Sequence, residues 1–464
     1  MKNYTIEKIK SSPVIALPSI CRSIRDDMIP AVLQSGGHLA SSLGCVELCA
    51  ALHKVFDSPV DQFVFDVGHQ AYAHKMITGR DITKLRQPGG VAPFTRPSES
   101  KHDAFIAGHS SVSVSAACGI AAAKKLAKEA GKAIVIIGDG ALTGGQAFEG
   151  LINAKDLSNI IIVINDNGMS ISKTGGALSS MLSDMRSAEA YIRTKQNTKD
   201  NLAKIPVVGA PTANAIGAVK ELVKSTVYRG NIFTDLGFSY YGVIDGHDTK
   251  DLVRTFSAAK ASRTPCVVHI KTTKGKGFTP AEKYPERFHG VAPKCNTNNK
   301  PSGPKPDEVF GETLCNLAKK DKRIVAITAA MTEGTGLTEF AKRFPKRFFD
   351  VGIAEQHAVT FAAALAGKGY IPVFAVYSTF LQRCFDQLIH DCALDPLHIV
   401  LAIGRAGNLD DGDTHAGVFD ERMLSIIPRT EIYNPKTAEQ LEKALQAAIY
   451  DDKYISAVRM GKCF

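Results

Sequence analysis

The sequence predicts an α/β protein built from two doubly wound parallel-sheet domains. Short apolar runs, typical of buried parallel strands, alternate along the chain with alanine-rich runs of helical length. A segment rich in Pro, Gly and Asn at residues 295–307 separates two such series, and this composition is typical of a linker. We therefore expect one domain at residues 1–294 and a second at 308–464, joined by the linker 295–307.

In the first domain, the continuous apolar runs Ala133–Ile137 and Ile160–Ile164 are predicted to be buried strands. Residues 111–130 are rich in alanine and are predicted to form a helix directly after Gly108-His109-Ser110. The amino end of such a helix is suited to bind an anion. Residues 173–205 combine weak periodicity with many Ser, Gly, Lys and Arg residues, so we expect a mobile surface segment there.

In the second domain, strands are predicted at Ile324–Thr328, Pro372–Val376 and Ile399–Ile403. The run Val351–Ala354 is predicted to be the end of an apolar strand, with Glu355 at the start of the helix that follows. A carboxyl group at such a junction is expected to be buried, and burial raises its pKa. The alternative is a purely structural role, in which the glutamate lies at the start of a helix and is stabilised by the helix dipole.

Composition and charge limit the classes of function. Of the 464 residues, 44% are hydrophobic and 22% charged, as in ordinary globular enzymes. The first residues carry charges where a signal peptide needs an apolar run, and no apolar stretch reaches membrane-spanning length. We therefore expect a cytoplasmic protein without a membrane partner, and its ten scattered cysteines are expected to be reduced thiols.

The net charge of +10 does not indicate a nucleic-acid partner, because Lys and Arg residues are spread along the chain. The chain has no Trp and only 7% aromatic residues, which leaves little material for stacking on bases. Small anionic substrates explain the positive charge more simply.

Two strand ends carry oxygen ligands suited to a magnesium ion. Asp139 lies in Gly138-Asp139-Gly140, directly after the first predicted strand, and Asn167 follows the second. Met169 is able to add only its backbone carbonyl. Because Mg²⁺ prefers oxygen ligands and is usually shared with bound phosphates, this pattern predicts a metal-bound diphosphate. Glycine on both sides of Asp139 allows the backbone to approach phosphate closely.

Five motifs, in this order along the chain, resemble the 1-deoxy-D-xylulose-5-phosphate synthase family. They are Ser35–Ser41, Asp66–Tyr72, Gly108–Ser111, Ile353–Val359 and Tyr377–Arg383. The resemblance implies the thiamine-diphosphate-binding fold, thiamine diphosphate and Mg²⁺ as cofactors, and a homodimer. The family normally has a third, C-terminal domain, whereas this sequence stops at Phe464. A separate protein carrying that domain is therefore kept open as a partner.

The resemblance also assigns roles to individual residues. Glu355 is expected to hydrogen-bond the aminopyrimidine of the cofactor and to assist removal of its C2 proton, which a positioned carboxyl group can do. The other residues are assigned as follows: catalytic, His38, His289, His415 and Asp411; cofactor-binding, His69, Gly108, His109, Ser110, Gly140, Ala141, Asn167, Ile171, Phe278, Glu355 and Phe380; substrate-binding, Tyr377, Arg383 and Arg459; metal-binding, Asp139, Asn167 and Met169. His38, His289 and His415 are expected to carry protons, because histidines ordinarily titrate near neutral pH.

The implied reaction is decarboxylation of pyruvate on thiamine diphosphate, followed by addition of the resulting two-carbon enamine to D-glyceraldehyde 3-phosphate. This is the entry step to isoprenoids in the family, and it also feeds thiamine synthesis. Both cofactor-binding domains of one chain contribute to the site in this family, so a single polypeptide is expected to carry all of it.

Three departures from the family pattern leave the acceptor open. Gly168 replaces a Glu in the metal loop, Gly404 replaces an Asp, and the loop that follows Gly407 is one residue shorter with Asp413 in place of Pro. The chain end also differs from the usual sequence. Two alternatives therefore remain: a carboligase or transketolase-like paralogue with another acceptor, and a catalytically silent subunit that requires a C-terminal partner.

Overall fold

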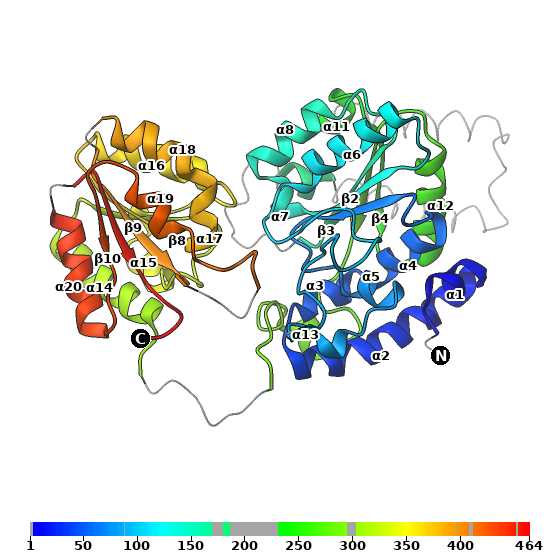
Figure 1. Cartoon of the computed structure of the whole chain (residues 1–464), viewed down its shortest axis with the longest axis horizontal. Coiled ribbons are helices and arrows are strands. Elements are labelled where there is room, and N and C mark those ends of the chain that lie inside the picture. The colour runs from blue at the N-terminus through cyan, green and yellow to red at the C-terminus, as the bar shows by residue number, and fades with distance from the viewer. Residues whose placement is uncertain are drawn as a thin grey trace, which may run out of the picture. The chain divides into compact units, whose positions relative to one another are not determined.

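The computed structural model describes residues 3–87, 89–168, 180–185, 231–294, 303–395, 397–407, 412–451 and 453–464. The chain divides into two compact units (Figure 1). Unit 1 comprises Met1–Thr83, Phe94–Ser170 and Gly176–Ala292, and unit 2 comprises the other residues up to Phe464. Most of the predicted linker, residues 295–302, lies outside the described residues.

Unit 1 is built on a parallel sheet with the strand order β1-β2-β3-β5-β4 (Figure 1). Its strands are β1 (Gln62–Phe65), β2 (Ala133–Gly138), β3 (Ile160–Asp166), β4 (Ser239–Asp245) and β5 (Cys266–Lys271). The central strands β2 and β3 pair from Ala133 opposite Ile160 to Gly138 opposite Asn165. Both strands predicted in this domain are therefore confirmed.

Helices of unit 1 cover both faces of this sheet. They are α1 (Ile6–Ser11), α2 (Leu17–Ser35), α3 (Leu39–Gly44), α4 (Val46–Val55), α5 (Tyr72–Ile77), α6 (Ser113–Ala127), α7 (Asp139–Leu142), α8 (Gly145–Asn153), α11 (Ile232–Asp235), α12 (Thr249–Ala261) and α13 (Thr279–Lys283). Helices α6 and α8 pack on the face that carries Val135 and Ile162. Ile134 and Ile161 point to the opposite face and are also fully buried, so the doubly wound arrangement follows from the continuous apolar runs.

The helix predicted at residues 111–130 is confirmed as α6. It is somewhat shorter than predicted, because Lys128 adopts the left-handed conformation with φ +55° and ends the helix. Within the segment 173–205, only residues 180–185 are described, and they are helical. The predicted mobility of the remainder lies outside the described residues.

Unit 2 contains a second parallel sheet, with the strand order β10-β11-β9-β8-β6-β7. Its strands are β6 (Ile324–Thr328), β7 (Phe348–Asp350), β8 (Ile371–Tyr377), β9 (Ile399–Gly404), β10 (Thr430–Tyr433) and β11 (Ile455–Arg459). The helices are α14 (Pro306–Lys320), α15 (Thr338–Arg343), α16 (Glu355–Ala366), α17 (Ser378–Leu381), α18 (Phe385–Gln387), α19 (Asp420–Ser425) and α20 (Ala438–Tyr450), with a π-helical turn at Leu388–Ala393. All three predicted strands are present.

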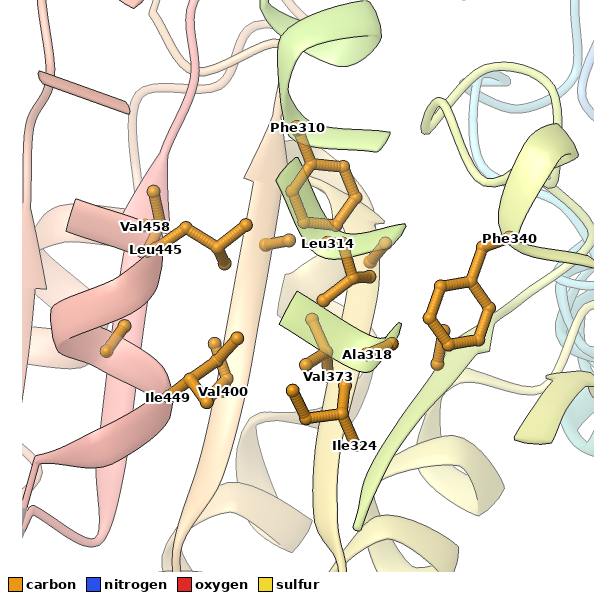
Figure 2. Packing of buried hydrophobic residues seen from close by; sticks show 14 of the residues in the cluster. Phe310, Leu314, Ala318, Ile324, Phe340, Val373, Val400, Leu445, Ile449 and Val458 are labelled. Atoms are coloured by element: carbon orange, nitrogen blue, oxygen red, sulfur yellow. The ribbon is translucent and has the colours of Figure 1, made fainter. Parts of the chain in front are cut away.

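Figure 2 shows how the helices of unit 2 pack on one face of the sheet. Phe310 and Leu314 of α14 and Leu445 of α20 lie over Val373 and Val400 of the central strands. The other face is covered by α16, whose Ala358, Val359 and Ala362 belong to a second buried cluster. The prediction of two parallel sheets flanked by helices is therefore confirmed.

One local prediction in unit 2 is wrong. The strand before Glu355 is Phe348–Asp350, and the apolar run Val351–Ala354 forms the connection to α16. Gly352 has φ +74°, which interrupts an extended strand. Helix α14 also begins at Pro306, inside the last residues of the predicted linker.

Candidate active site

Asp139 and Asn167 lie at the carboxyl ends of neighbouring strands in unit 1. Because β2 and β3 are parallel and paired, their ends meet at the same edge of the sheet. Asp139 begins the single helical turn α7 and is only 7% exposed. A Cβ built on Gly138 or Gly140 would meet no other part of the described chain within 4 Å, so there is space beside this turn. Backbone N–H groups at the start of such a turn have no intrahelical partner and suit phosphate oxygens.

A buried chain of polar groups fixes the end of β3 just before Asn167. Asp166 accepts a hydrogen bond from the backbone N–H of Gly168 at 3.0 Å, and its second oxygen lies 2.9 Å from His269 Nε2. Tyr240 Oη lies 2.7 Å from His269 Nδ1. Asp166 and His269 are fully buried. The backbone that carries Asn167 is therefore anchored from inside the domain.

The segment after Gly108 is attached to the same edge of the sheet. The buried carboxylate of Asp66, directly after β1, accepts hydrogen bonds from the N–H groups of Ser111 at 2.8 Å and Ser113 at 3.1 Å. The Ser111 hydroxyl donates to the carbonyl of Ala141 at 2.7 Å. These contacts bring the segment Gly108-His109-Ser110, next to Ser111, close to the turn that carries Asp139.

Three of the predicted histidines form one cluster in unit 1. The ring centroids of His38, His69 and His289 lie 5.5 to 5.9 Å apart. Burial lowers the pKa of His289 to about 4 and holds the pKa of His69 well below its ordinary range, and Lys274 adds to both effects. The expectation that the catalytic histidines titrate near neutral pH is therefore wrong for His289, and both His69 and His289 are uncharged at pH 7. His69 Nδ1 is buried and has no hydrogen-bond partner among the described residues.

Lys274 is a functional candidate that the sequence analysis missed. It lies after β5, and its charge interacts with Asp139, His69 and His289. Burial lowers the pKa of its ammonium group, whereas Asp139 raises it. A signal was present in the sequence, because Lys274-Gly275-Lys276-Gly277 is a basic, glycine-rich run directly after an apolar strand. The sequence pattern assigns a role only to Phe278 in this region, and the ring centroids of Phe278 and Phe288 lie 5.5 Å apart.

Glu355 is the first residue of α16 in unit 2 and is only 3% exposed. Its Oε2 accepts a hydrogen bond from Arg383 Nε at 3.0 Å. Burial raises the pKa of the Glu355 carboxyl group, and Arg383 opposes part of this rise. The raised pKa agrees with the sequence prediction, and it is the direction required of a group that holds a proton for exchange.

An aromatic group at the end of β8 brings three predicted residues together. The rings of Tyr377 and Phe380 are stacked with centroids 6.1 Å apart, and the edge of His415 faces Phe380 at 5.7 Å. Arg405 was not predicted, yet its guanidinium lies over the Tyr377 ring at 4.5 Å. A Cβ on Gly404 would lie 3.3 Å from Tyr377 Cδ1, so the absence of a side chain at this position makes room for the tyrosine ring.

Two predicted phosphate ligands contact acidic side chains. Arg383 donates to Glu355, as described above. Arg459 donates to both oxygens of Asp420 at 2.7 and 3.1 Å, and to Glu421 and Asn434, each at 2.8 Å. These partners compete with a substrate phosphate for the guanidinium of Arg459.

Three of the predicted site residues have no described position. Met169, Ile171 and Asp411 lie outside the described residues. No group of three or more His, Cys, Asp or Glu side chains is arranged to hold a metal in the described part of the chain. The predicted magnesium ligands are one carboxylate, one amide and one backbone carbonyl, a combination that such a group would not contain. No helix in the described ranges is long and apolar enough to cross a membrane.

Comparison with known proteins supports the family resemblance over nearly the whole chain. Residues 2–272 match the family model for 1-deoxy-D-xylulose-5-phosphate synthase, and residues 304–463 match that for the pyrimidine-binding domain of transketolase. The 1-deoxy-D-xylulose-5-phosphate synthase of Desulfitobacterium hafniense (strain Y51) is 48% identical over 444 residues, which cover 94% of this chain and 70% of the relative.

Two further matches extend this comparison. The synthase of Caldanaerobacter subterraneus subsp. tengcongensis is 49% identical over 440 residues, which cover 93% of this chain and 71% of the relative. Among solved structures, the transketolase of Campylobacter jejuni aligns with 97% of this chain and 78% of its own at 17% identity, with a TM-score of 0.44. From the family models and the identities to its relatives, the chain belongs to the 1-deoxy-D-xylulose-5-phosphate synthase family.

Proposed function

We propose that this chain is a thiamine-diphosphate-dependent transferase that converts pyruvate and D-glyceraldehyde 3-phosphate to 1-deoxy-D-xylulose 5-phosphate and carbon dioxide. One observation supports this most strongly. A single chain of this family retains both an oxygen-ligand turn at a sheet edge, with Asp139 and Asn167, and a buried glutamate with a raised pKa, Glu355.

Unit 1 is proposed to bind the diphosphate and Mg²⁺ at the carboxyl edge of its sheet. The residues present fit this group, because the space beside Gly138 and Gly140 and the unsatisfied, buried His69 Nδ1 are what a bound anion would fill. Asp139 and Asn167 would hold the metal, with the Met169 carbonyl as third ligand. The N–H groups of Gly140 and Ala141, the Gly108-His109-Ser110 segment and Lys274 would face phosphate oxygens. We also propose the domain limits expected from the sequence, 1–294 and 308–464, with a linker at 295–307.

Unit 2 is proposed to bind the aminopyrimidine. Bound thiamine diphosphate supplies a carbon nucleophile and an electron sink for decarboxylation. Glu355 would hold a proton toward the pyrimidine ring, and Phe380 would stack on that ring, with Ile171 and Phe278 lining the rest of the cofactor. Arg383 fixes the orientation of the Glu355 carboxyl group through the 3.0 Å contact.

Burial lowers the pKa of His289, and its uncharged ring suits hydrogen bonding to a reacting carbonyl group. His38 and His289 in unit 1, and His415 with Asp411 in unit 2, are proposed to donate and accept protons there. Tyr377 and Arg405 are proposed to bind the acceptor phosphate, because a guanidinium fork matches phosphate oxygens. Arg383 and Arg459 keep the substrate-binding roles proposed from the sequence.

The contacts of Arg459 favour one second candidate function, a paralogous carboligase with a different acceptor. Asp420 and Glu421 neutralise this arginine, so less positive charge remains for an acceptor phosphate. Gly404 and Asp413, which replace the usual residues of the family, also favour a different acceptor.

The experiment that decides between these candidates uses carbon-13-labelled pyruvate with Mg²⁺, thiamine diphosphate and a panel of phosphorylated and unphosphorylated aldehydes. Formation of labelled 1-deoxy-D-xylulose 5-phosphate at the highest kcat/KM in the panel supports the proposal. Faster turnover with another aldehyde would assign the chain to the paralogue, and no carbon dioxide release with any acceptor would contradict both.

We also propose a homodimer in the cytoplasm. The cysteines within the described ranges are all free, as in a reducing compartment. Light scattering at micromolar concentration should give twice the mass of the chain, and a monomeric mass would refute the dimer.

A further inference from the structure

Hydrogen bonds hold the loop that carries Lys274 at several points. It follows β5 and runs from Thr273 to Gly277. The N–H of Gly275 donates to the carbonyl of Ala40 at 2.8 Å, which attaches the middle of the loop to α3. On either side of Gly275, Thr273 and Lys276 are attached to a largely buried group of charged and polar side chains.

That group consists of Arg25 from α2, Glu47 from α4 and His247, two residues after β4. Arg25 Nη1 and Nη2 donate to the two oxygens of Glu47 at 2.5 and 2.7 Å, and its Nε donates to the carbonyl of Lys276 at 2.7 Å. His247 Nδ1 lies 3.0 Å from Glu47 Oε2. Arg25 and Glu47 are each 7% exposed. Side chains from α2 and from the segment after β4 therefore meet at one carboxylate of α4.

The contact of His247 with the loop fixes the tautomer of the imidazole. The backbone N–H of Thr273 donates to His247 Nε2 at 2.8 Å. A backbone N–H can only donate, so Nε2 has no proton in this arrangement and the ring hydrogen lies on Nδ1, from where it donates to Glu47. Hydrogen bonds from Arg25 and His247 lower the pKa of Glu47 to about 2 despite its burial, so the carboxylate is an acceptor at neutral pH.

Space for this arrangement is provided by Gly277. Its φ is +84°, and a Cβ there would come within 2.7 Å of Arg25 Cδ. The absence of a side chain lets the guanidinium reach the carbonyl of Lys276. Two features of this basic, glycine-rich loop are thus explained. The loop carries Lys274, and Gly277 allows the close approach of Arg25.

We propose that Arg25, Glu47 and His247 are positioning residues that hold the Thr273–Lys276 backbone so that the ammonium group of Lys274 faces the diphosphate. This inference rests on the proposed function of unit 1. None of the three need touch the cofactor. Their effect on cofactor binding passes through Lys274, and an experiment can isolate this dependence.

Two amide substitutions separate the two ring nitrogens of His247. In His247→Gln the amide oxygen reaches the place of Nε2 and can accept from Thr273, whereas in His247→Asn the amide reaches only the place of Nδ1 and the Thr273 N–H loses its acceptor. We expect the Kd of thiamine diphosphate, measured by calorimetry with saturating Mg²⁺, to rise about tenfold in His247→Asn and clearly less in His247→Gln.

A double-mutant cycle then tests the route through Lys274. Lys274→Met alone should weaken cofactor binding, and adding His247→Asn to it should change the Kd less than about twofold. The control His53→Gln affects another buried histidine of unit 1, and is expected to lower the melting temperature while the Kd stays the same. Additive effects of His247→Asn and Lys274→Met, or equal Kd values for the Asn and Gln variants, would overturn the inference. Failure of the wild-type chain to bind the cofactor would instead contradict the proposed function.

Discussion

A pair of buried histidines is expected to limit the stability of unit 1 in acid. His74 Nε2 lies 3.1 Å from Asp103, and His74 Nδ1 lies 3.0 Å from His53 Nε2. Because Asp103 accepts, the ring hydrogens point from His53 to His74 and from His74 to Asp103. His53 Nδ1 is left buried without a partner among the described residues. Burial lowers the pKa of His74 from 6.5 to about 4 and that of His53 well below its ordinary range, so both rings are uncharged in the folded chain at neutral pH.

The direction of the pH effect follows from these lowered pKa values. Below pH 6.5 an unfolded chain binds a proton at His74 that the folded chain does not bind. Stability is therefore fully present above pH 6.5 and is lost as the pH falls toward 4. At about 1.4 kcal/mol for each tenfold change in proton affinity, His74 alone accounts for about 3 kcal/mol over this interval.

The assay is urea unfolding followed by circular dichroism between pH 7 and 4.5. His74→Gln keeps a donor to Asp103 but cannot titrate. Its apparent free energy of unfolding should be lower than that of the wild type at pH 7. On acidification, however, it should fall by about 2 to 3 kcal/mol less than that of the wild type. His390→Gln, at an exposed histidine whose pKa is raised by its contact with Asp391, is the matched control and should not reduce the loss of stability on acidification. Equal pH dependence in the wild type and His74→Gln would refute the reasoning.

Three predictions concern the site itself. Glu355→Gln should keep the contact to Arg383 and bind the cofactor, yet lower the rate of carbon dioxide release from pyruvate roughly 10²–10⁴-fold, since an amide cannot exchange the proton; a rate within a factor of a few of wild type would mean that Glu355 only caps α16. Asp139→Ala should abolish the Mg²⁺ dependence of thiamine diphosphate binding in calorimetry, with little change in melting temperature; unchanged affinity would remove Asp139 from the metal site. Arg405→Met should raise the KM for a phosphorylated aldehyde about tenfold or more, while the KM for pyruvate stays the same; an equal rise for both substrates would show that Arg405 only packs on Tyr377.

The fold and the positions of the main candidate residues were predictable because they depend on local sequence. Continuous apolar runs such as Ala133–Ile137 and Ile160–Ile164 predict parallel strands, and parallel strands bring Asp139 and Asn167 to one edge without further information. Glu355 was found from its place at the start of a helix together with the family-like run Ile353–Val359 around it. The strand before it was misplaced, because an apolar run containing a glycine with positive φ reads like a strand.

Contacts between distant residues were not predictable. The loop with Lys274 lies far from Asp139 in the sequence, and neither segment contains a pattern that predicts their interaction. The pKa of His289 depends on how deeply the fold buries it and on that same lysine. Arg459 pairs with Asp420 and Glu421, which lie on a separate helix. The sequence pattern therefore could not predict whether Arg459 is available to bind a phosphate.

The central claim is that this one chain both binds and activates thiamine diphosphate, and exchange of the cofactor's C2 proton tests it most directly. The exchange rate for deuterium is measured by quenched-flow proton NMR on the cofactor bound to the chain with Mg²⁺. The account predicts exchange far faster than in the cofactor alone, by a factor that falls roughly 10²–10⁴-fold in Glu355→Gln. Exchange at the rate of the cofactor alone, in a chain that calorimetry shows to be saturated, would contradict it.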